Sequence, residues 1–191
     1  MAQRDLARGL RSARFSRLGR EWQHALAGAA AGGGPRPAAR QTVARLAASR
    51  IGRAHRRVLR NGGAITATSP PESLHELRKR CKELRYLLEF FGSLYDPGQH
   101  WQAVRELKAL QDCLGEFQDT QVQHEEIRVF AAQMMEQRAA PAATLLAMGE
   151  IAAGLAARQQ KARSEFADRF RDFASPDGQN RIRVLTGAAA A

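Results

Sequence analysis

The stretch SLHELRKRCKELRYLLEFF, residues 73–91, combines two side-chain patterns in one segment of helical length. Apolar residues recur at steps of three and four, which at about 100° per residue places them on roughly one third of a helical wheel. They are Leu74, Leu77, Cys81, Leu84, Leu88 and Phe91. This spacing is typical of a helix that buries one seam against neighbouring helices, and Gly92 is its expected end.

A second, mostly cationic stripe follows the apolar seam, each member standing one position after a seam residue. It consists of His75, Arg78, Lys82, Arg85 and Glu89, with Lys79 and Tyr86 at its outer edge. Because the stripe adjoins the seam, it points partly into the groove beside the helix, where unneutralised charge is costly. We therefore interpret it as an anion-binding surface, against the alternative of an ordinary solvated face.

The preceding segment, residues 40–60, repeats this arrangement. One apolar stripe predicts a helix, and it contains Val43, Ala47, Ile51, Ala54 and Val58. The opposite side carries Arg45, Arg53, Arg56, Arg57 and Arg60, and residues 36–71 contain eight arginines and no acid. Two such helices side by side would repel each other, and a bound polyanion would remove that repulsion.

The charge of the whole chain is equally uneven. The formal net charge is +11, yet residues 1–86 hold 19 of the 30 Lys and Arg and only 5 of the 19 acids, so they carry +14. Such a balance favours a polyanionic partner, namely nucleic acid, an acidic membrane surface or inorganic polyphosphate. No apolar run approaches the roughly 20 residues of a membrane span, and the first 15 residues lack the apolar centre of a signal peptide. We expect a cytoplasmic protein without a membrane partner.

The rest of the chain also predicts helices. They cover residues 3–26, 99–117, about 120–138 with Asp119 as N-cap, and an Ala-rich segment to about residue 173. A Gly- and Pro-rich stretch, 28–40, reads as a flexible linker, and residues 174–191 as a disordered tail. With no strand-like alternation, we predict an all-α antiparallel bundle of five or six helices in one domain, 1–173. The two cysteines, Cys81 and Cys113, are predicted to be buried free thiols.

At these residues the chain resembles a known family. The stretch around His75 resembles the H-x-x-R-x-x-x-K-x-L-R-Y signature of CHAD domains, the conserved-histidine α-helical domains; it matches at His75, Arg78, Lys82, Leu84, Arg85 and Tyr86. Residues 107–122, LKALQDCLGEFQDTQV, resemble the family's next segment, and residues 11–26 resemble the helix that precedes both. Family members usually carry two related helical halves. The resemblance, over residues 3 to about 173, implies that this chain corresponds to the C-terminal half of a two-bundle domain, so we expect a homodimer in which a second copy replaces the missing half.

The resemblance also implies a function, which is binding of inorganic polyphosphate in a basic channel, with association with polyphosphate granules in bacteria. We therefore predict a non-catalytic polyphosphate-binding module. Arg78 and Arg85 would hold phosphate oxygens bidentately, and Lys82 would act as a point charge. His75 and Tyr86 would add hydrogen bonds, and Lys79 would contribute from the outer edge of the stripe. The channel would be widened by Arg53, Arg56, Arg57, Arg60 and Lys108.

Two other functions stay open at this point. Charge alone supports non-specific nucleic-acid binding, although no helix-turn-helix, zinc or RRM pattern is present and few aromatic residues are available for stacking. An enzyme acting on phosphoanhydrides would need carboxylates for a metal, and Asp112, Glu116 and Asp119 could share a helix face. An ordinary solvated or capping role fits these acids better, because the chain has no Walker loop and no Cys/His cluster. We predict no catalytic residue, no metal and no cofactor.

Overall fold

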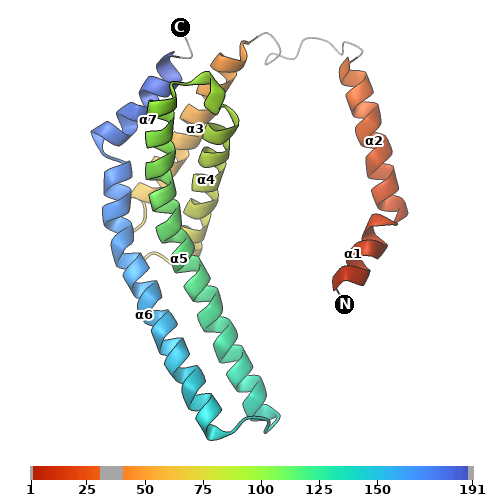
Figure 1. Ribbon diagram of the computed structural model, residues 1–191, viewed down its shortest axis with the longest axis vertical. Coiled ribbons are helices and arrows are strands. Elements are labelled where there is room, and N and C mark those ends of the chain that lie inside the picture. Colours follow the sequence, from red (N-terminus) through yellow and green to blue (C-terminus); the bar gives the residue numbers. More distant parts are fainter. Residues whose placement is uncertain (1, 31–40, 189–191) are drawn as a thin grey trace. The chain divides into compact units, whose positions relative to one another are not determined.

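The computed structural model describes residues 2–30 and 41–188 of the chain and divides it into two compact units, Met1–Thr42 and Val43–Ala191 (Figure 1). The predicted linker, 28–40, lies mostly outside the described residues, and its first three residues belong to a helix. None of the described helices is long and apolar enough to cross a membrane.

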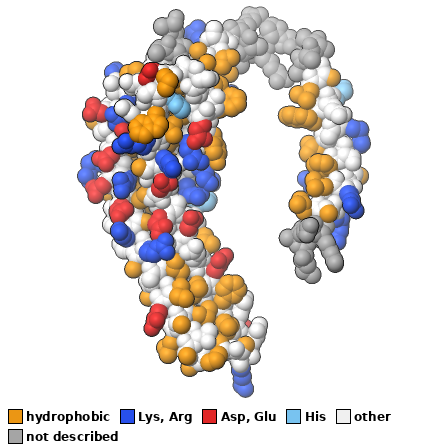
Figure 2. Space-filling view, viewed as in Figure 1, with side chains coloured by type: hydrophobic (Ala, Val, Ile, Leu, Met, Phe, Trp, Pro, Cys, Tyr) orange, Lys and Arg blue, Asp and Glu red, His pale blue; other side chains and the backbone are white. Residues whose placement is uncertain are grey.

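The first unit contains two helices, α1 (Ala2–Leu10) and α2 (Ala13–Ala30), where the sequence predicted one helix over 3–26. The chain breaks at Ser12, whose hydroxyl oxygen accepts a hydrogen bond from the Phe15 backbone N–H at 3.2 Å, as an N-cap does. Along α2, the apolar side chains form a stripe that is about half exposed or more (Figure 2); it consists of Phe15, Leu18, Trp22 and Leu26.

The second unit is an antiparallel helical bundle, and no strand occurs among the residues that the structure describes. Its elements are α3 (Val43–Gly63), α4 (Pro71–Phe90), the 3₁₀ turn η2 (Gly92–Leu94), α5 (Pro97–Glu136), α6 (Ala142–Phe173) and α7 (Pro176–Ala188). α4 lies between α3 and α5, and α7 contacts both α3 and α5. The long hairpin of α5 and α6 extends beyond the other helices (Figure 1). The predicted all-α fold is confirmed.

The core of this bundle is built on the predicted seam of α4. Leu77, Cys81, Leu84 and Leu88 are 0% exposed, and they belong to one cluster with buried side chains of α3, α5, α6 and α7. Both cysteines are free and buried, as predicted, and desolvation raises the pKa of Cys81 to about 12. A thiol with so high a pKa is protonated at neutral pH and chemically inert, so Cys81 acts as a core residue.

The structure corrects the prediction of two helices over 99–117 and 120–138. α5 is one continuous helix of 40 residues, and Asp119 lies inside it rather than at an N-cap. The actual N-cap is Asp96, whose carboxylate accepts from the Gln99 backbone N–H at 2.9 Å. The chain has no Gly or Pro between residues 116 and 120, and Thr120 donates its hydroxyl hydrogen bond back to the Glu116 carbonyl. Nothing therefore interrupts the helix.

The prediction of a disordered tail over 174–191 is wrong for the residues described. Residues 176–188 form α7, in which Ile182 and Leu185 are 3% and 2% exposed in the core. The helix begins at Pro176, and the Ser175 side chain accepts a hydrogen bond from the Gly178 backbone N–H at 3.1 Å. Only two well-spaced apolar residues bury this helix, which is too few for a clear helical period in the sequence.

α3 ends three residues beyond the helix predicted over 40–60, and one of its last two glycines has a packing role. α3 continues through Gly63, and Gly62 is buried. A Cβ atom at Gly62 would clash with the ring of Phe170, so the absence of a side chain lets α6 pack closely against the end of α3. Gly62 therefore serves close helix packing rather than a left-handed turn.

Candidate anion-binding site

A groove of about 360 Å³ lies between α4 and α5. Its α4 wall is made by the three central bases of the cationic stripe, Arg78, Lys82 and Arg85. These positions reach the groove because each one follows a buried seam residue, so the fold of α4 directs them there. The α5 wall consists of Gln111, Asp112, Gly115, Glu116 and Asp119.

Two buried hydrogen-bond donors in this groove have no acceptor in the part of the chain that the structure describes. They are Nε of Arg85 and Nε2 of Gln111. Arg85 Nε lies 3.5 Å from the Glu89 carboxylate, close enough for an ion pair but without hydrogen-bond geometry. Buried N–H groups without an acceptor are rare and destabilise the folded state, so two in one groove indicate a place for an external acceptor.

The bases of the α4 wall are only partly neutralised. Arg78 and Lys82 form no ion pair with any residue in the described ranges, whereas Arg85 has the long contact with Glu89. The Arg85 guanidinium also lies 5.4 Å from the centroid of the Tyr86 ring, a cation–π distance. Tyr86 itself is 55% exposed, so its role here is to orient Arg85 rather than to line the groove.

The carboxylates of the α5 wall were considered from the sequence as metal ligands. Glu116 instead pairs with Arg158 of α6 at 2.7 Å. Among the described residues, no group of three or more His, Cys, Asp or Glu could hold a metal ion. Asp112 and Asp119 are exposed at the groove, where they lower its positive charge on the α5 side. The sequence alone gave no sign that these acids face the cationic stripe.

His75 lies outside the groove lining but ties its two walls together. Its Nδ1 is 2.9 Å from Oε1 of Gln118 on α5. Because an amide oxygen only accepts, Nδ1 carries the proton in this contact, and Nε2 is left for another partner. His75 is exposed, so this second nitrogen is accessible to a ligand that enters between α4 and α5.

The remaining predicted site residues do not join this groove. Lys79 forms an ion pair with Glu76, and Arg57 lies 3.3 Å from Glu83 across the contact of α3 with α4. Arg56 lines a different pocket, between α3 and α7. Among the described residues around the groove, neither Arg53, Arg60 nor Lys108 contributes to the lining, although all three are exposed. The structure therefore brings three of the predicted bases together in the α4/α5 groove, with His75 at its edge. The other predicted bases do not join them to form one wide channel.

Figure 2 shows how charged and apolar side chains are distributed on one face of the second unit. Lys and Arg side chains gather over its wider end with acids among them, whereas the free end of the α5 and α6 hairpin is mainly apolar. Gln111 and Gly115 were noted in the sequence only as part of the resemblance. Their contribution to the groove follows from their place on α5 opposite Arg78 and Arg85, and a hypothetical Cβ at Gly115 would lie 3.9 Å from Arg78 Nε.

Comparison with known protein families identifies the family of this chain. The family model of the CHAD domain matches residues 1–128. The chain belongs to the CHAD domain family. The match includes both walls of the α4/α5 groove and stops before α6 and α7, whereas the sequence resemblance was expected to extend to about residue 173. No curated protein matches the chain.

Proposed function

We propose that the α4/α5 groove binds inorganic polyphosphate and that the protein is a non-catalytic polyphosphate-binding module. The observation that carries this proposal is the pair of buried N–H donors, Arg85 Nε and Gln111 Nε2, one on each wall of a groove whose α4 wall is cationic. Phosphate oxygens are strong acceptors and would satisfy both donors at once. Membership in the CHAD family supports the same ligand.

The proposed binding mode follows from the two walls. Arg78, Lys82 and Arg85 are spaced by one helical turn each and span about 10 Å along α4, which suits an extended chain of phosphates. Asp112 and Asp119 repel an anion that lies against α5, so the phosphate chain is expected to follow α4 and to reach α5 only at Gln111. His75 would donate from Nε2 at the end of the groove when its ring is charged.

Competition between polyanions tests this proposal. We expect polyphosphate to displace a labelled polyphosphate tracer at much lower total phosphate than duplex DNA or single-stranded RNA, because the groove offers charge and N–H donors but no stacking surface for bases. Affinity should fall steeply with salt, as for other phosphate polymers. Equal displacement by all three polymers would favour non-specific nucleic-acid binding. Release of orthophosphate with added Mg²⁺ would support the phosphoanhydride enzyme instead.

A charge-neutral substitution separates the donor geometry from simple charge attraction. Gln111→Met removes one buried donor and keeps the side-chain size and the net charge. We expect polyphosphate affinity to fall about tenfold, since a hydrogen bond to a charged group contributes about 1.5–3 kcal/mol. The salt dependence should stay the same because no cation is lost. Isothermal titration calorimetry at two salt concentrations measures both quantities, and an unchanged affinity would remove Gln111 from the site.

Two further predictions from the sequence extend this proposal. One is association with polyphosphate granules in the cytoplasm, which co-localisation with stained granules tests. The other is a homodimer, for which a monomeric mass by light scattering at micromolar concentration would be the contrary result.

A further inference from the structure

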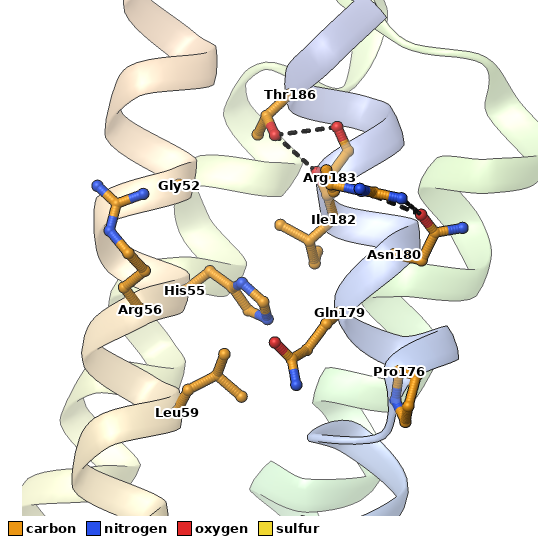
Figure 3. A pocket seen from close by; sticks show the side chains of 10 residues that line it. All are labelled: Gly52, His55, Arg56, Leu59, Pro176, Gln179, Asn180, Ile182, Arg183 and Thr186. Carbon is orange, nitrogen blue, oxygen red and sulfur yellow. Dashed lines mark hydrogen bonds between the residues drawn. The ribbon is translucent and has the colours of Figure 1, made fainter.

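A second pocket, of about 510 Å³, lies between α3 and α7 (Figure 3). It is on the other side of the bundle from the α4/α5 groove, because α3 and α5 each contact both α4 and α7. Its chemistry comes mainly from His55, Arg56, Leu59, Gln179, Ile182 and Arg183. The α7 residues lie beyond the part of the chain that the family model matches, so only the α3 wall of the pocket belongs to the matched CHAD region.

The pocket is cationic on both walls. Arg56 extends along α3 beside Gly52, and Arg183 projects from α7 (Figure 3). Nε and Nη2 of Arg183 donate to Oδ1 of Asn180 at 3.2 and 2.7 Å, which orients the guanidinium without neutralising it. No Asp or Glu in the described ranges lines the pocket. The two guanidinium groups lie on opposite sides of the pocket, and together they make its surroundings electropositive, which favours an anion.

His55 supplies an unsatisfied polar atom at the inner wall. The residue is 7% exposed, and its Nε2 has no hydrogen-bond partner within the described structure. The ring packs edge-on against Phe173 at 5.6 Å. Burial, and secondarily Arg56, lowers the pKa of His55 to about 4, so the ring is neutral at physiological pH. A neutral imidazole in this place can hydrogen-bond to a ligand without adding charge.

One movable side chain covers this atom. Figure 3 shows the His55 ring and the Gln179 side chain pointing toward each other. Gln179 is exposed, and its Nε2 donates to the Ala174 carbonyl at 2.7 Å, so a ligand can displace it by breaking one surface hydrogen bond. Beside it, Leu59 and Ile182 provide an apolar surface. The size and the mixture of apolar and convergent polar groups are those of a small-molecule site.

We propose that this pocket binds a small organic anion with an apolar body, such as an aryl phosphate. The positive charge of Arg56 and Arg183 attracts the anionic group to the rim of the pocket, the apolar body packs against Leu59 and Ile182, and a polar atom of the ligand reaches His55 Nε2. Polyphosphate has no apolar part and leaves Leu59 and Ile182 unused. The pocket is therefore a site separate from the proposed polyphosphate groove and does not depend on it.

Titration of the full chain with phenyl phosphate, followed by NMR, tests this proposal. We expect saturable shifts of the His55 ring nitrogens and nuclear Overhauser contacts from the phenyl ring to the methyl groups of Leu59 and Ile182. Phenol and inorganic phosphate each supply only half of the recognition, and each should bind at least about tenfold more weakly. Absence of saturable shifts at His55 would overturn the proposal, and so would equal binding of inorganic phosphate.

Matched variants locate the anion contact. Arg183→Gln should weaken phenyl phosphate about tenfold, whereas Arg50→Gln, which removes an equally exposed arginine of α3 outside the pocket, should leave it unchanged. Equal loss in both variants would indicate general charge attraction and overturn the site. Saturating polyphosphate should not displace phenyl phosphate from His55. Displacement would mean that the pocket and the α4/α5 groove form one polyanion-binding surface, and would overturn a separate site. If polyphosphate bound nowhere, the proposed function would fail but phenyl phosphate binding at His55 would still support the pocket.

Discussion

The triple variant Arg78→Ala, Lys82→Ala, Arg85→Ala is expected to lose polyphosphate affinity by about a hundredfold or more at moderate salt. Each of these bases offers charge-assisted hydrogen bonds of about 1.5–3 kcal/mol, and their shared groove makes the losses partly redundant. Fluorescence anisotropy with labelled polyphosphate measures the loss. Circular dichroism should show unchanged helicity, because none of the three belongs to the buried seam of α4.

A control variant with the same loss of charge distinguishes a site from a net-charge effect. Arg128→Ala, Lys161→Ala, Arg171→Ala also removes three cations, all exposed and outside the α4/α5 groove. It should weaken polyphosphate binding only slightly. Lys79→Ala should lie between the two, because Lys79 is on α4 but pairs with Glu76 away from the groove. If the two triple variants lose equal affinity, the α4/α5 groove is not the binding site.

The fold was predictable where one apolar pattern decides burial. The seam of α4 repeats at steps of three and four residues over about four turns, and every seam position from Leu74 to Leu88 is buried. Asp119 misled the prediction because a side chain that can cap a helix is also compatible with the middle of one. α7 was missed because Ile182 and Leu185 become core residues only through contact with distant helices, which a local pattern does not record.

The candidate site was predictable along one helix but not across two. The spacing of Arg78, Lys82 and Arg85 followed from the α4 seam alone. What faces them depends on the rotation of α5 about its own axis, and this rotation brings Gln111 and Asp112 to the groove. The sequence likewise placed Arg56 and Arg57 on one polar face. In the structure Arg57 forms an ion pair with Glu83 of α4, whereas Arg56 lines the pocket between α3 and α7. The distribution of charge along the chain therefore predicted a polyanion-binding surface. It did not predict that the cations would be divided between separate sites.

Acid is expected to destabilise the bundle through His55 by about 3 kcal/mol between pH 7 and pH 4. In the folded chain burial lowers the pKa of His55 to about 4 from its ordinary 6.5, so between these values the unfolded state binds more protons. The free energy of unfolding therefore rises with pH across this window. The stabilising contribution of His55 is fully present above about pH 6.5 and is lost as the pH falls toward 4. Arg56 and Arg183 are the charged groups that line the pocket, and Arg56 adds to the effect of burial in lowering the pKa of the ring.

Urea unfolding of the wild type and of His55→Leu at several pH values isolates this contribution. The leucine variant removes both the titrating ring and the unpaired Nε2, so at pH 7 it should be as stable as the wild type or more stable. Its stability should fall less steeply between pH 6.5 and 4, and the difference between the two proteins should reach about 3 kcal/mol at the acid end. Carboxylates titrate in both proteins and cancel in this difference. His124→Leu, in the long α5 helix, controls for the loss of any one histidine. Parallel curves of stability against pH for the wild type and His55→Leu would contradict the prediction, because His55 would then have the same pKa in the folded and unfolded states.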